Sequence, residues 1–188
     1  MSKELATQLK KLASIEIGRE EVRLKFIERL QNELLTRDER QLTHVAVFVM
    51  AIDISKSMVY IGHHKKSDRW IPHGGHVDKG ELIEQTLERE IQEEWGIQMK
   101  ANDIGEPEFL TITEIENPKQ WKVCRRHYDV WYFVRVNNED FEVDPELLHE
   151  EFHEARWVNL NDARNLVGNT PTVQEALDFV EMRYFQKD

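Results

Sequence analysis

The chain has little cysteine, proline or glycine: its 188 residues include one Cys, five Pro and eight Gly. The single cysteine, Cys124, cannot form a disulfide within the chain, so we expect a reducing, cytoplasmic compartment. Because Cys124 falls in an expected strand, we predict a structural thiol rather than a nucleophile. No run of about 18 apolar residues occurs, which argues against a transmembrane helix. Residues 1–14 also lack the apolar segment of a secretory signal.

Basic residues are scarcer than acidic ones, with 25 Lys and Arg against 36 Asp and Glu, and the formal net charge is −11. Proteins that coat nucleic acid need a basic face for phosphate contacts, so the composition argues against that class. A polyanionic substrate could still bind through a metal ion and a few local cations. The length and the hydrophobic content of 40% suit one globular domain with an appendage.

The most informative segment is residues 75–97, which read GHVDKGELIEQTLEREIQEEWGI. From Glu81 to Trp95 there is no glycine or proline, and apolar residues recur at near-helical spacing. This pattern predicts an amphipathic helix that begins near Glu81.

Three glutamates, Glu90, Glu93 and Glu94, stand at i, i+3 and i+4 of this expected helix, so their carboxylates share one face. Like charges repel at that spacing, and a hard divalent cation with oxygen ligands, Mg²⁺ or Mn²⁺, removes the repulsion. A solvated acidic face is the alternative. The glycine-rich segment 73–80, expected to be a loop, favours a metal site, because glycine lets a Gly74 carbonyl approach a metal ion closely.

The same residues resemble the Nudix family. Its motif is G-x5-E-x7-R-E-U-x-E-E-x-G-U, with U an aliphatic residue, and each specified position from Gly75 to Ile97 is filled. With the surrounding strand and helix pattern, the resemblance extends over residues 43–185. It implies an α/β/α sandwich with a mixed sheet and a divalent metal cofactor. It also implies hydrolysis of a nucleoside diphosphate linked to a moiety X, by attack of water on a diphosphate phosphorus.

The resemblance also implies roles for residues of the motif. Glu93 and Glu94, with the carbonyl of Gly74, correspond to the main metal ligands. Glu90 corresponds to a further ligand or to the general base, so we count Glu90 and Glu94 among the catalytic candidates. Arg89 resembles the residue that orients the glutamates; the alternative is a surface ion pair of little energetic value.

The residues that flank the motif differ from many relatives at one place. Many relatives read Pro-Gly-Gly where this chain has His73 before the glycines, which leaves the expected metal ligands intact. Nudix enzymes also recruit a further acid from outside the motif. Glu151 is our first candidate for that acid and Glu154 the second, with solvated loop acids as the alternative. Glu81, at the start of the helix, suits the helix dipole and is expected to have a structural role.

Candidate substrate contacts are the cations Lys66, Arg69 and Arg126, which could bind phosphates or could serve as exposed charge. His76 is a candidate for the substrate as well. It belongs to a group of four histidines before the helix, at positions 63, 64, 73 and 76. They show no regular ligand spacing, and the neighbouring expected metal site is rich in carboxylates, which disfavours zinc. The aromatic residues Trp70, Tyr128 and Trp131 could stack on a base or belong to the core.

The remaining pattern predicts the order of elements. Helices are expected at 3–13, 19–36, 161–166 and from Pro171 onward, and strands at 44–53, 58–63, 97–100, 108–114, 128–136 and 155–158. We therefore divide the chain into a helical extension, residues 1–42, and a Nudix domain, residues 43–188. An apolar stripe from Val22 to Leu34 must be covered, which predicts docking on the core or, as we favour, a homodimer.

Two classes of function fit the sequence. The first is a Mg²⁺- or Mn²⁺-dependent pyrophosphohydrolase acting on a nucleoside triphosphate, a nucleotide sugar, a dinucleoside polyphosphate or a similar compound. The second is a non-catalytic module of the same fold that senses a nucleotide or binds a partner. The complete set of motif carboxylates favours the enzyme, because a retired site would be free to lose them.

Overall fold

The computed structural model describes residues 2–31, 34–39, 42–115 and 124–186. Its helices are α1 (Ser2–Ser14), α2 (Glu20–Arg29), α3 (Ile83–Trp95), α4 (Ala101–Ile104), α5 (Pro145–Glu151), α6 (Leu160–Val167) and α7 (Pro171–Val180), which continues into a π-helical turn, Glu181–Phe185. Its strands are β1 (Thr43–Asp53), β2 (Met58–His64), β3 (Arg69–Ile71), β4 (His73–His76), β5 (Phe109–Glu114), β6 (Arg126–Arg135) and β7 (Phe152–Asn159).

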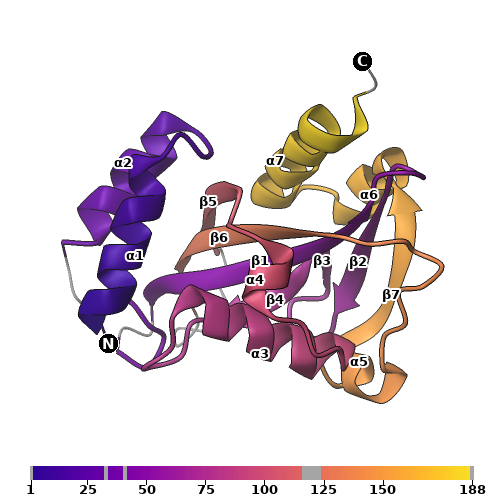
Figure 1. Cartoon of the computed structure of the whole chain (residues 1–188), viewed down its shortest axis with the longest axis horizontal. Coiled ribbons are helices and arrows are strands. Elements are labelled where there is room, and N and C mark those ends of the chain that lie inside the picture. Colours follow the sequence, from indigo (N-terminus) through magenta and orange to yellow (C-terminus); the bar gives the residue numbers. More distant parts are fainter. Residues whose placement is uncertain (1, 32–33, 40–41, 116–123, 187–188) are drawn as a thin grey trace.

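The strands form one mixed sheet around β1, in the order β3-β2-β1-β6-β5. β1 and β6 are parallel over their whole length, from Thr43 opposite Arg126 to Ile52 opposite Arg135. The other edge of β1 is shared by two antiparallel strands, β2 near its end and β4 near its middle. β7 pairs antiparallel with β2. Figure 1 shows α3 and α5 on one side of this sheet and α6 and α7 on the other.

The central strand β1 reads as an almost continuous apolar run because both of its faces are covered. Its alternate residues Val45, Val47 and Val49 belong to the core under α3, and Met50 and Ile52 belong to the core under α6 and α7. The sheet therefore separates two hydrophobic layers. This is the α/β/α sandwich with a mixed sheet that the sequence predicts.

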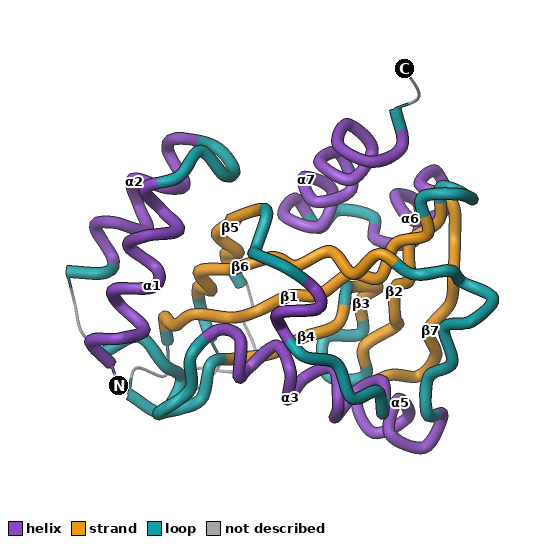
Figure 2. Tube along the Cα trace, in the orientation of Figure 1, coloured by secondary structure: helices purple, strands orange, loops and turns teal. Residues whose placement is uncertain are grey.

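The N-terminal helices pack against the end of the sheet, as the chain trace in Figure 2 shows. Val22, Phe26 and Leu30 of the apolar stripe are buried, and Phe26 meets Tyr128 of β6 edge-on with ring centroids 5.2 Å apart. Leu34 is exposed. The chain itself thus covers most of the stripe, which removes the argument for a homodimer; the homodimer itself stays a prediction.

The N-terminal extension also touches the start of α3. The side chain of Gln8 accepts a hydrogen bond from the Ile83 amide at 3.3 Å and donates to Glu84. Leu82, at the N-cap position of α3, has no polar side chain with which to cap the helix, and its own amide is bound by Gln85 at 2.8 Å. A residue of α1 therefore supplies a cap that the local sequence lacks.

Several expected boundaries were wrong. Residues 97–100 form no strand: Gly96 ends α3 in the left-handed conformation, and Ile97 and Met99 pack against the core from a connection to α4. The segment expected as a loop begins with a strand, β4. The second helix stops at Arg29, before residue 36.

Two further points differ from the expectation. Helix α5 was missed, although Asp144 caps it through hydrogen bonds from two backbone amides and Pro145 occupies its first turn. Cys124 lies before β6 rather than within a strand. Among the described residues, no helix has the length and apolar character needed to cross a membrane.

Candidate active site

Strand β4 lies against helix α3, and its glycines make this contact possible. A Cβ atom on Gly75 would lie 2.3 Å from a carboxylate oxygen of Glu90, and one on Gly74 would lie 2.2 Å from the Val47 carbonyl of β1. Gly74 also has a φ of 123°, which L side chains rarely adopt. The glycine pair therefore fits β4 between β1 and the carboxylates of α3.

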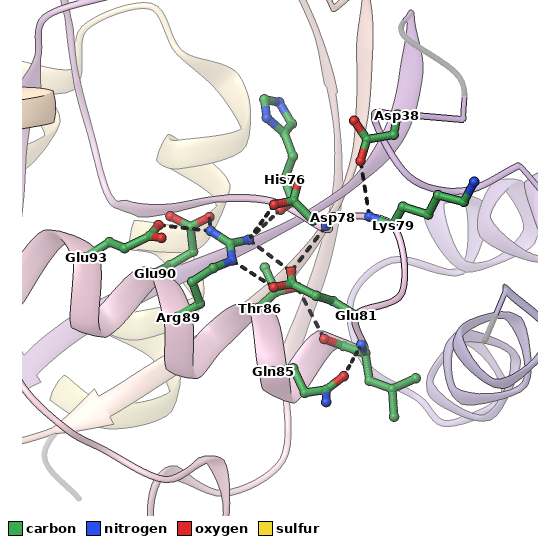
Figure 3. Close-up of polar contacts among 11 residues, drawn as sticks. Asp38, His76, Asp78, Lys79, Glu81, Gln85, Thr86, Arg89, Glu90 and Glu93 are labelled. Carbon is green, nitrogen blue, oxygen red and sulfur yellow. Dashed lines mark hydrogen bonds and ion pairs between the residues drawn. The ribbon is translucent and has the colours of Figure 1, made fainter.

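Arg89 is the centre of a polar network on α3 (Figure 3). Its guanidinium donates two hydrogen bonds to Glu81, at 2.8 and 3.0 Å. It donates to Glu90 at 2.6 Å, to Glu93 at 3.0 Å and to the His76 carbonyl at 3.0 Å. The pKa of Arg89 is raised, first by the hydrogen bond to Glu81. This geometry fits the orienting role that the resemblance implies for Arg89 and disfavours the surface ion pair.

Glu81 precedes the helix and contacts Arg89 rather than the open side of the site. Partial burial raises the pKa of Glu81, but hydrogen bonds from Arg89, Thr86 and the Asp78 amide outweigh it and hold this pKa below its usual range. A carboxylate kept charged in this way anchors the guanidinium, which agrees with the structural role expected for Glu81.

Glu90 and Glu94 are buried side by side, one turn apart, whereas Glu93 is exposed. Burial, followed by the charge of Glu94, raises the pKa of Glu90 to about 8, against the opposing effect of Arg89. Burial also raises the pKa of Glu94 well above its usual value. Two buried carboxyls thus share a site in which one cation, Arg89, does not compensate both charges.

His73 is a site residue whose role the sequence does not reveal. It is fully buried, and its Nδ1 lies 3.1 Å from an oxygen of Glu94, which also accepts a hydrogen bond from the Gly74 amide at 2.9 Å. Its ring packs against Phe152 and Tyr60, and burial lowers its pKa to about 3. A neutral imidazole therefore helps to position Glu94. The only signal in the sequence is its place where many relatives have proline.

Of the two acids considered outside the motif, Glu151 lies nearer to the glutamates of α3. It ends α5, it is exposed, and its charge contributes to the raised pKa of Glu94. One of its carboxylate oxygens lies 3.2 Å from Nε2 of His64. Glu154 lies on β7 opposite His63, further along the sheet edge.

The candidate substrate contacts occupy different places. Lys66 and Arg69 are exposed at the β2–β3 turn and on β3, and the charge of Lys66 acts on both His64 and His76. Arg126, at the start of β6, is paired with Glu114 at 2.6 Å. Of the three candidate cations, Lys66 is thus the one whose charge acts on His64 at the edge of the site, whereas Arg126 is engaged with Glu114.

The four histidines expected before the helix do not form one group. His63 pairs with Asp68, His64 lies near Glu151, and His73 is enclosed in the core. His76 turns instead toward His127, with their Nε2 atoms 3.1 Å apart.

The three aromatic candidates also separate. Tyr128 and Trp131 are core residues, whereas Trp70 is half-buried and stacks on His63. Only Trp70 among them has a partly open ring.

The mixed sheet lies between two helical layers, and its strand β4, which contains two glycines, lies against α3, which carries Arg89 and three glutamates. This is the architecture of a hydrolase that cleaves phosphoric anhydrides. The chain belongs to the Nudix family: the model of the NUDIX domain matches residues 42–179. It is a hydrolase that cleaves diphosphate bonds, and its family generally uses divalent metal ions. The non-catalytic alternative is therefore set aside.

Solved structures share the fold at low sequence identity. The E. coli dihydroneopterin triphosphate pyrophosphohydrolase superimposes with a TM-score of 0.60 at 17% identity, over 74% of this chain and 94% of that one. A binary complex of the C. elegans Ap4A hydrolase gives a TM-score of 0.54 at 19% identity, over 75% of this chain and 96% of that one. At these identities the likeness establishes the fold alone.

Curated relatives are more similar in sequence. An RNA pyrophosphohydrolase of Sphingopyxis alaskensis is 32% identical over 120 residues, which are 58% of this chain and 73% of the relative. An RNA pyrophosphohydrolase of Pelagibacter ubique is 34% identical over 103 residues, 52% of this chain and 63% of the relative.

Proposed function

We propose that this hydrolase uses Mg²⁺ or Mn²⁺ to cleave the polyphosphate of a nucleoside 5′-triphosphate, either free or at the 5′ end of an RNA. The buried pair Glu90 and Glu94 carries the proposal, because two carboxyls in one poorly solvated site call for a cation. The RNA pyrophosphohydrolases among the relatives support the choice of a 5′-triphosphate. The net charge of −11 fits an enzyme that acts on an end rather than one that coats a strand. We also propose a cytoplasmic location, which the lone cysteine supports.

The donor set fits a hard divalent cation. Glu90, Glu93 and Glu94 offer oxygen ligands on one face of α3, and the Gly74 amide donates to Glu94 at 2.9 Å, so the backbone of Gly74 lies beside them. When bound, the cation would neutralise charge on the diphosphate and lower the pKa of a coordinated water. These four residues are the ligands that we propose.

Other side chains of the site orient the glutamates. Arg89 holds Glu90 and Glu93 in place while Glu81 anchors it from the other side. His73 and the Gly74 amide hold one oxygen of Glu94. Precise orientation of this kind matters in phosphoryl transfer, where catalysis is mainly positioning and charge neutralisation.

Glu151 is the general base that we propose, in preference to Glu90, Glu94 or Glu154. It is exposed, so it can meet a water molecule, and its charge acts on Glu94, so it lies at the edge of the same site. His64 at 3.2 Å can accept or pass on the proton that Glu151 removes. Lys66, beside this edge, is the cation that we assign to the substrate phosphates. The roles in substrate binding that the sequence predicts for Arg69, Arg126 and His76 stay predictions.

A substrate panel tests the proposed reaction. Free nucleoside triphosphates, a 5′-triphosphorylated RNA oligomer, a dinucleoside tetraphosphate and a nucleotide sugar are incubated with Mg²⁺, and the products are identified by mass in heavy-oxygen water. We expect the 5′-triphosphates to be cleaved fastest, with the label showing which phosphorus is attacked. Fastest cleavage of the dinucleoside or sugar compound would contradict the substrate, but it would leave the enzyme class intact.

Glutamine variants test the metal ligands. Glu93→Gln and Glu94→Gln remove a charged oxygen but keep volume and helix propensity, so we expect most activity to be lost while the fold persists. Glu88→Gln is the matched control, because Glu88 lies on the same helix and pairs with Lys100. If both ligand variants work at the wild-type rate with Mg²⁺, the assignment of the ligands is wrong.

The base has its own test. Glu151→Gln should lower kcat by about 100-fold or more, the typical loss of a general base, with little change in KM. Glu154→Gln is the comparison, since it changes an acid of the adjacent strand. A large loss of kcat in Glu154→Gln, together with an unchanged kcat in Glu151→Gln, would assign the role of general base to Glu154.

A further inference from the structure

Four potential metal ligands converge outside the carboxylate site: His44, His76, Cys124 and His127. Each offers one ligand atom, and the four atoms all lie within 4.8 Å of one another. His44 is fully buried and the other three are partly buried. No carboxylate belongs to the group.

The sheet topology brings these residues together from distant parts of the chain. In the parallel pair β1–β6, His44 lies directly opposite His127. On the other edge of β1, His76 ends β4 opposite Ala46. Cys124 lies just before β6, separated from it by Arg125. Three neighbouring strands thus turn their side chains to one point, so rigid elements fix the geometry.

Two of the distances between ligand atoms agree with the edges of a tetrahedral zinc site, and none of the distances exceeds 4.8 Å. Zinc bonds of about 2.0–2.1 Å to nitrogen and about 2.3 Å to sulfur place two nitrogens about 3.3 Å apart and a nitrogen and a sulfur about 3.6 Å apart. Here Nε2 of His76 lies 3.1 Å from Nε2 of His127 and 3.6 Å from Sγ of Cys124. The ring centroid of His44 lies 4.5 Å from that of His76 and 4.9 Å from that of His127.

The donor chemistry selects the metal. Three imidazoles and one thiolate are borderline and soft ligands, which suit Zn²⁺, whereas Mg²⁺ and Mn²⁺ prefer the oxygen ligands of α3. Four protein ligands complete a tetrahedral shell, as in structural zinc sites. A hydrogen bond between His76 and His127 would account for one short distance, but it gives no reason for a third imidazole and the only thiol of the chain to converge there.

We propose that His44, His76, Cys124 and His127 bind one Zn²⁺ ion, separate from the divalent cation of the glutamates. The ion ties β1, β4 and β6 together one residue away from Gly75, the glycine that lies against Glu90. Its role is structural: it holds β4 in the register that the glutamates require. The site shares only His76 with the four histidines that the sequence groups before the helix.

Metal content of the full-length wild-type protein is the first measurement. The protein is stripped with a chelator, incubated with Zn²⁺ in the presence of excess Mg²⁺, desalted and analysed by mass spectrometry for metals. We expect one zinc per chain. Titration with Co²⁺ should give the absorption of tetrahedral cobalt with a thiolate-to-cobalt charge-transfer band. Absence of both from wild type at micromolar metal would overturn the proposal, whatever the variants do.

Variants then assign the ligands. Cys124→Ser should abolish the charge-transfer band and weaken zinc binding by more than about 10-fold, the smallest loss typical even of an outer-shell partner. His127→Gln should weaken zinc similarly, while His153→Gln, which changes an exposed histidine of β7, should change nothing. The double variant Glu93→Gln and Glu94→Gln should keep the band, because it alters only the carboxylate site. A band that survives in Cys124→Ser would place the metal elsewhere and contradict the site.

Discussion

Arg89 shows how much of the site depends on a single side chain. One guanidinium joins Glu81 before the helix, Glu90 and Glu93 on it, and the His76 carbonyl of β4. A planar fork of donors can satisfy several acceptors at fixed angles, whereas the ammonium of lysine is a point charge on a flexible stem. The shape of Arg89, and not only its charge, is therefore expected to matter.

We predict that Arg89→Lys lowers kcat by at least about 10-fold, because lysine cannot hold the glutamates at fixed angles. That factor corresponds to an increase of about 1.4 kcal/mol in the activation free energy. The measurement is steady-state hydrolysis of the best substrate. Arg164→Lys is the control, since Arg164 is equally exposed and also pairs with two carboxylates, Asp178 and Glu181, but lies on α6. Equal rates in the two variants would contradict the orienting role.

Asp129 gives a prediction on pH and stability. It is fully buried on β6, one of its oxygens accepts hydrogen bonds from Thr111 and Thr113, and burial raises its pKa to about 7. The folded protein thus holds this proton more tightly than the unfolded chain. Between about pH 4 and pH 7 the unfolded chain releases the proton first, so the free energy of unfolding falls as pH rises.

We predict that Asp129→Asn removes this part of the pH dependence. The difference in free energy of unfolding between variant and wild type should shift by about 1–4 kcal/mol in favour of the variant from about pH 4 to about pH 7. Urea denaturation at several pH values measures it. A difference that is flat across this window would show that Asp129 is charged in the folded protein.

Individual residues of the site were predictable to different degrees. The grouping of the glutamates follows from helical spacing, whereas the orienting role of Arg89 was implied only by the resemblance to the family motif. His73 could not be recognised, because its contact with Glu94 depends on how β4 lies on α3. His44 and His127 could not be grouped either, since only the register of β1 and β6 places them side by side.

At the scale of elements, the contact between β4 and α3 decides the geometry of the carboxylates. We predict that Gly75→Ala displaces Glu90, whose carboxylate lies 2.3 Å from the position of the new Cβ. The backbone of Gly75 has no positive φ, so the effect comes from the clash and not from backbone strain. Activity should fall by more than about 10-fold, a typical loss for misplaced reacting groups.

Gly168→Ala serves as the control for Gly75→Ala, because a Cβ there meets no atom within 4 Å. Its φ of 57° costs stability but does not involve the site. Thermal unfolding and hydrolysis are measured for both variants. Full activity in Gly75→Ala would show that Glu90 can move without consequence.

The elements themselves were predicted best where long periodic patterns exist. The central strands and the motif helix were found within a few residues, because burial imposes their periods. The strand expected at 97–100 was wrong. Ile97 and Met99 alternate with polar residues, as in a strand, but in the structure they pack on the core from the segment that connects α3 to α4. Strand β4 was missed because glycine, needed there for close packing, is a weak strand former.

At the scale of the whole molecule, the N-terminal helices belong to the same hydrophobic core as α3 and β1. We predict that Phe26→Ala lowers the free energy of unfolding by about 3–5 kcal/mol, the usual loss for a buried aromatic. Leu24→Ala, at an exposed position two residues earlier, should stay within about 0.5 kcal/mol of wild type. Similar losses in both variants would contradict docking on the sheet.

Light scattering of the full-length protein tests the homodimer that the sequence predicts. A monomer at micromolar concentration would contradict it. Deletion of residues 1–40 should lower stability as Phe26→Ala does, and it also removes the Gln8 contact with the Ile83 amide at the start of α3. A truncated protein that stays stable and fully active would show that the extension is dispensable.

The parallel pair β1–β6 also has a consequence for folding. It pairs Thr43 with Arg126, so β1 cannot form its parallel pairing until β6, which is synthesised much later, has left the ribosome. The entropy of closing so long a loop must be overcome before its contacts contribute, which makes such topologies slow to fold. We therefore expect β1, apolar on both faces, to be the segment most in need of chaperone protection during synthesis, and the histidines beside it to meet only in the last stage of folding.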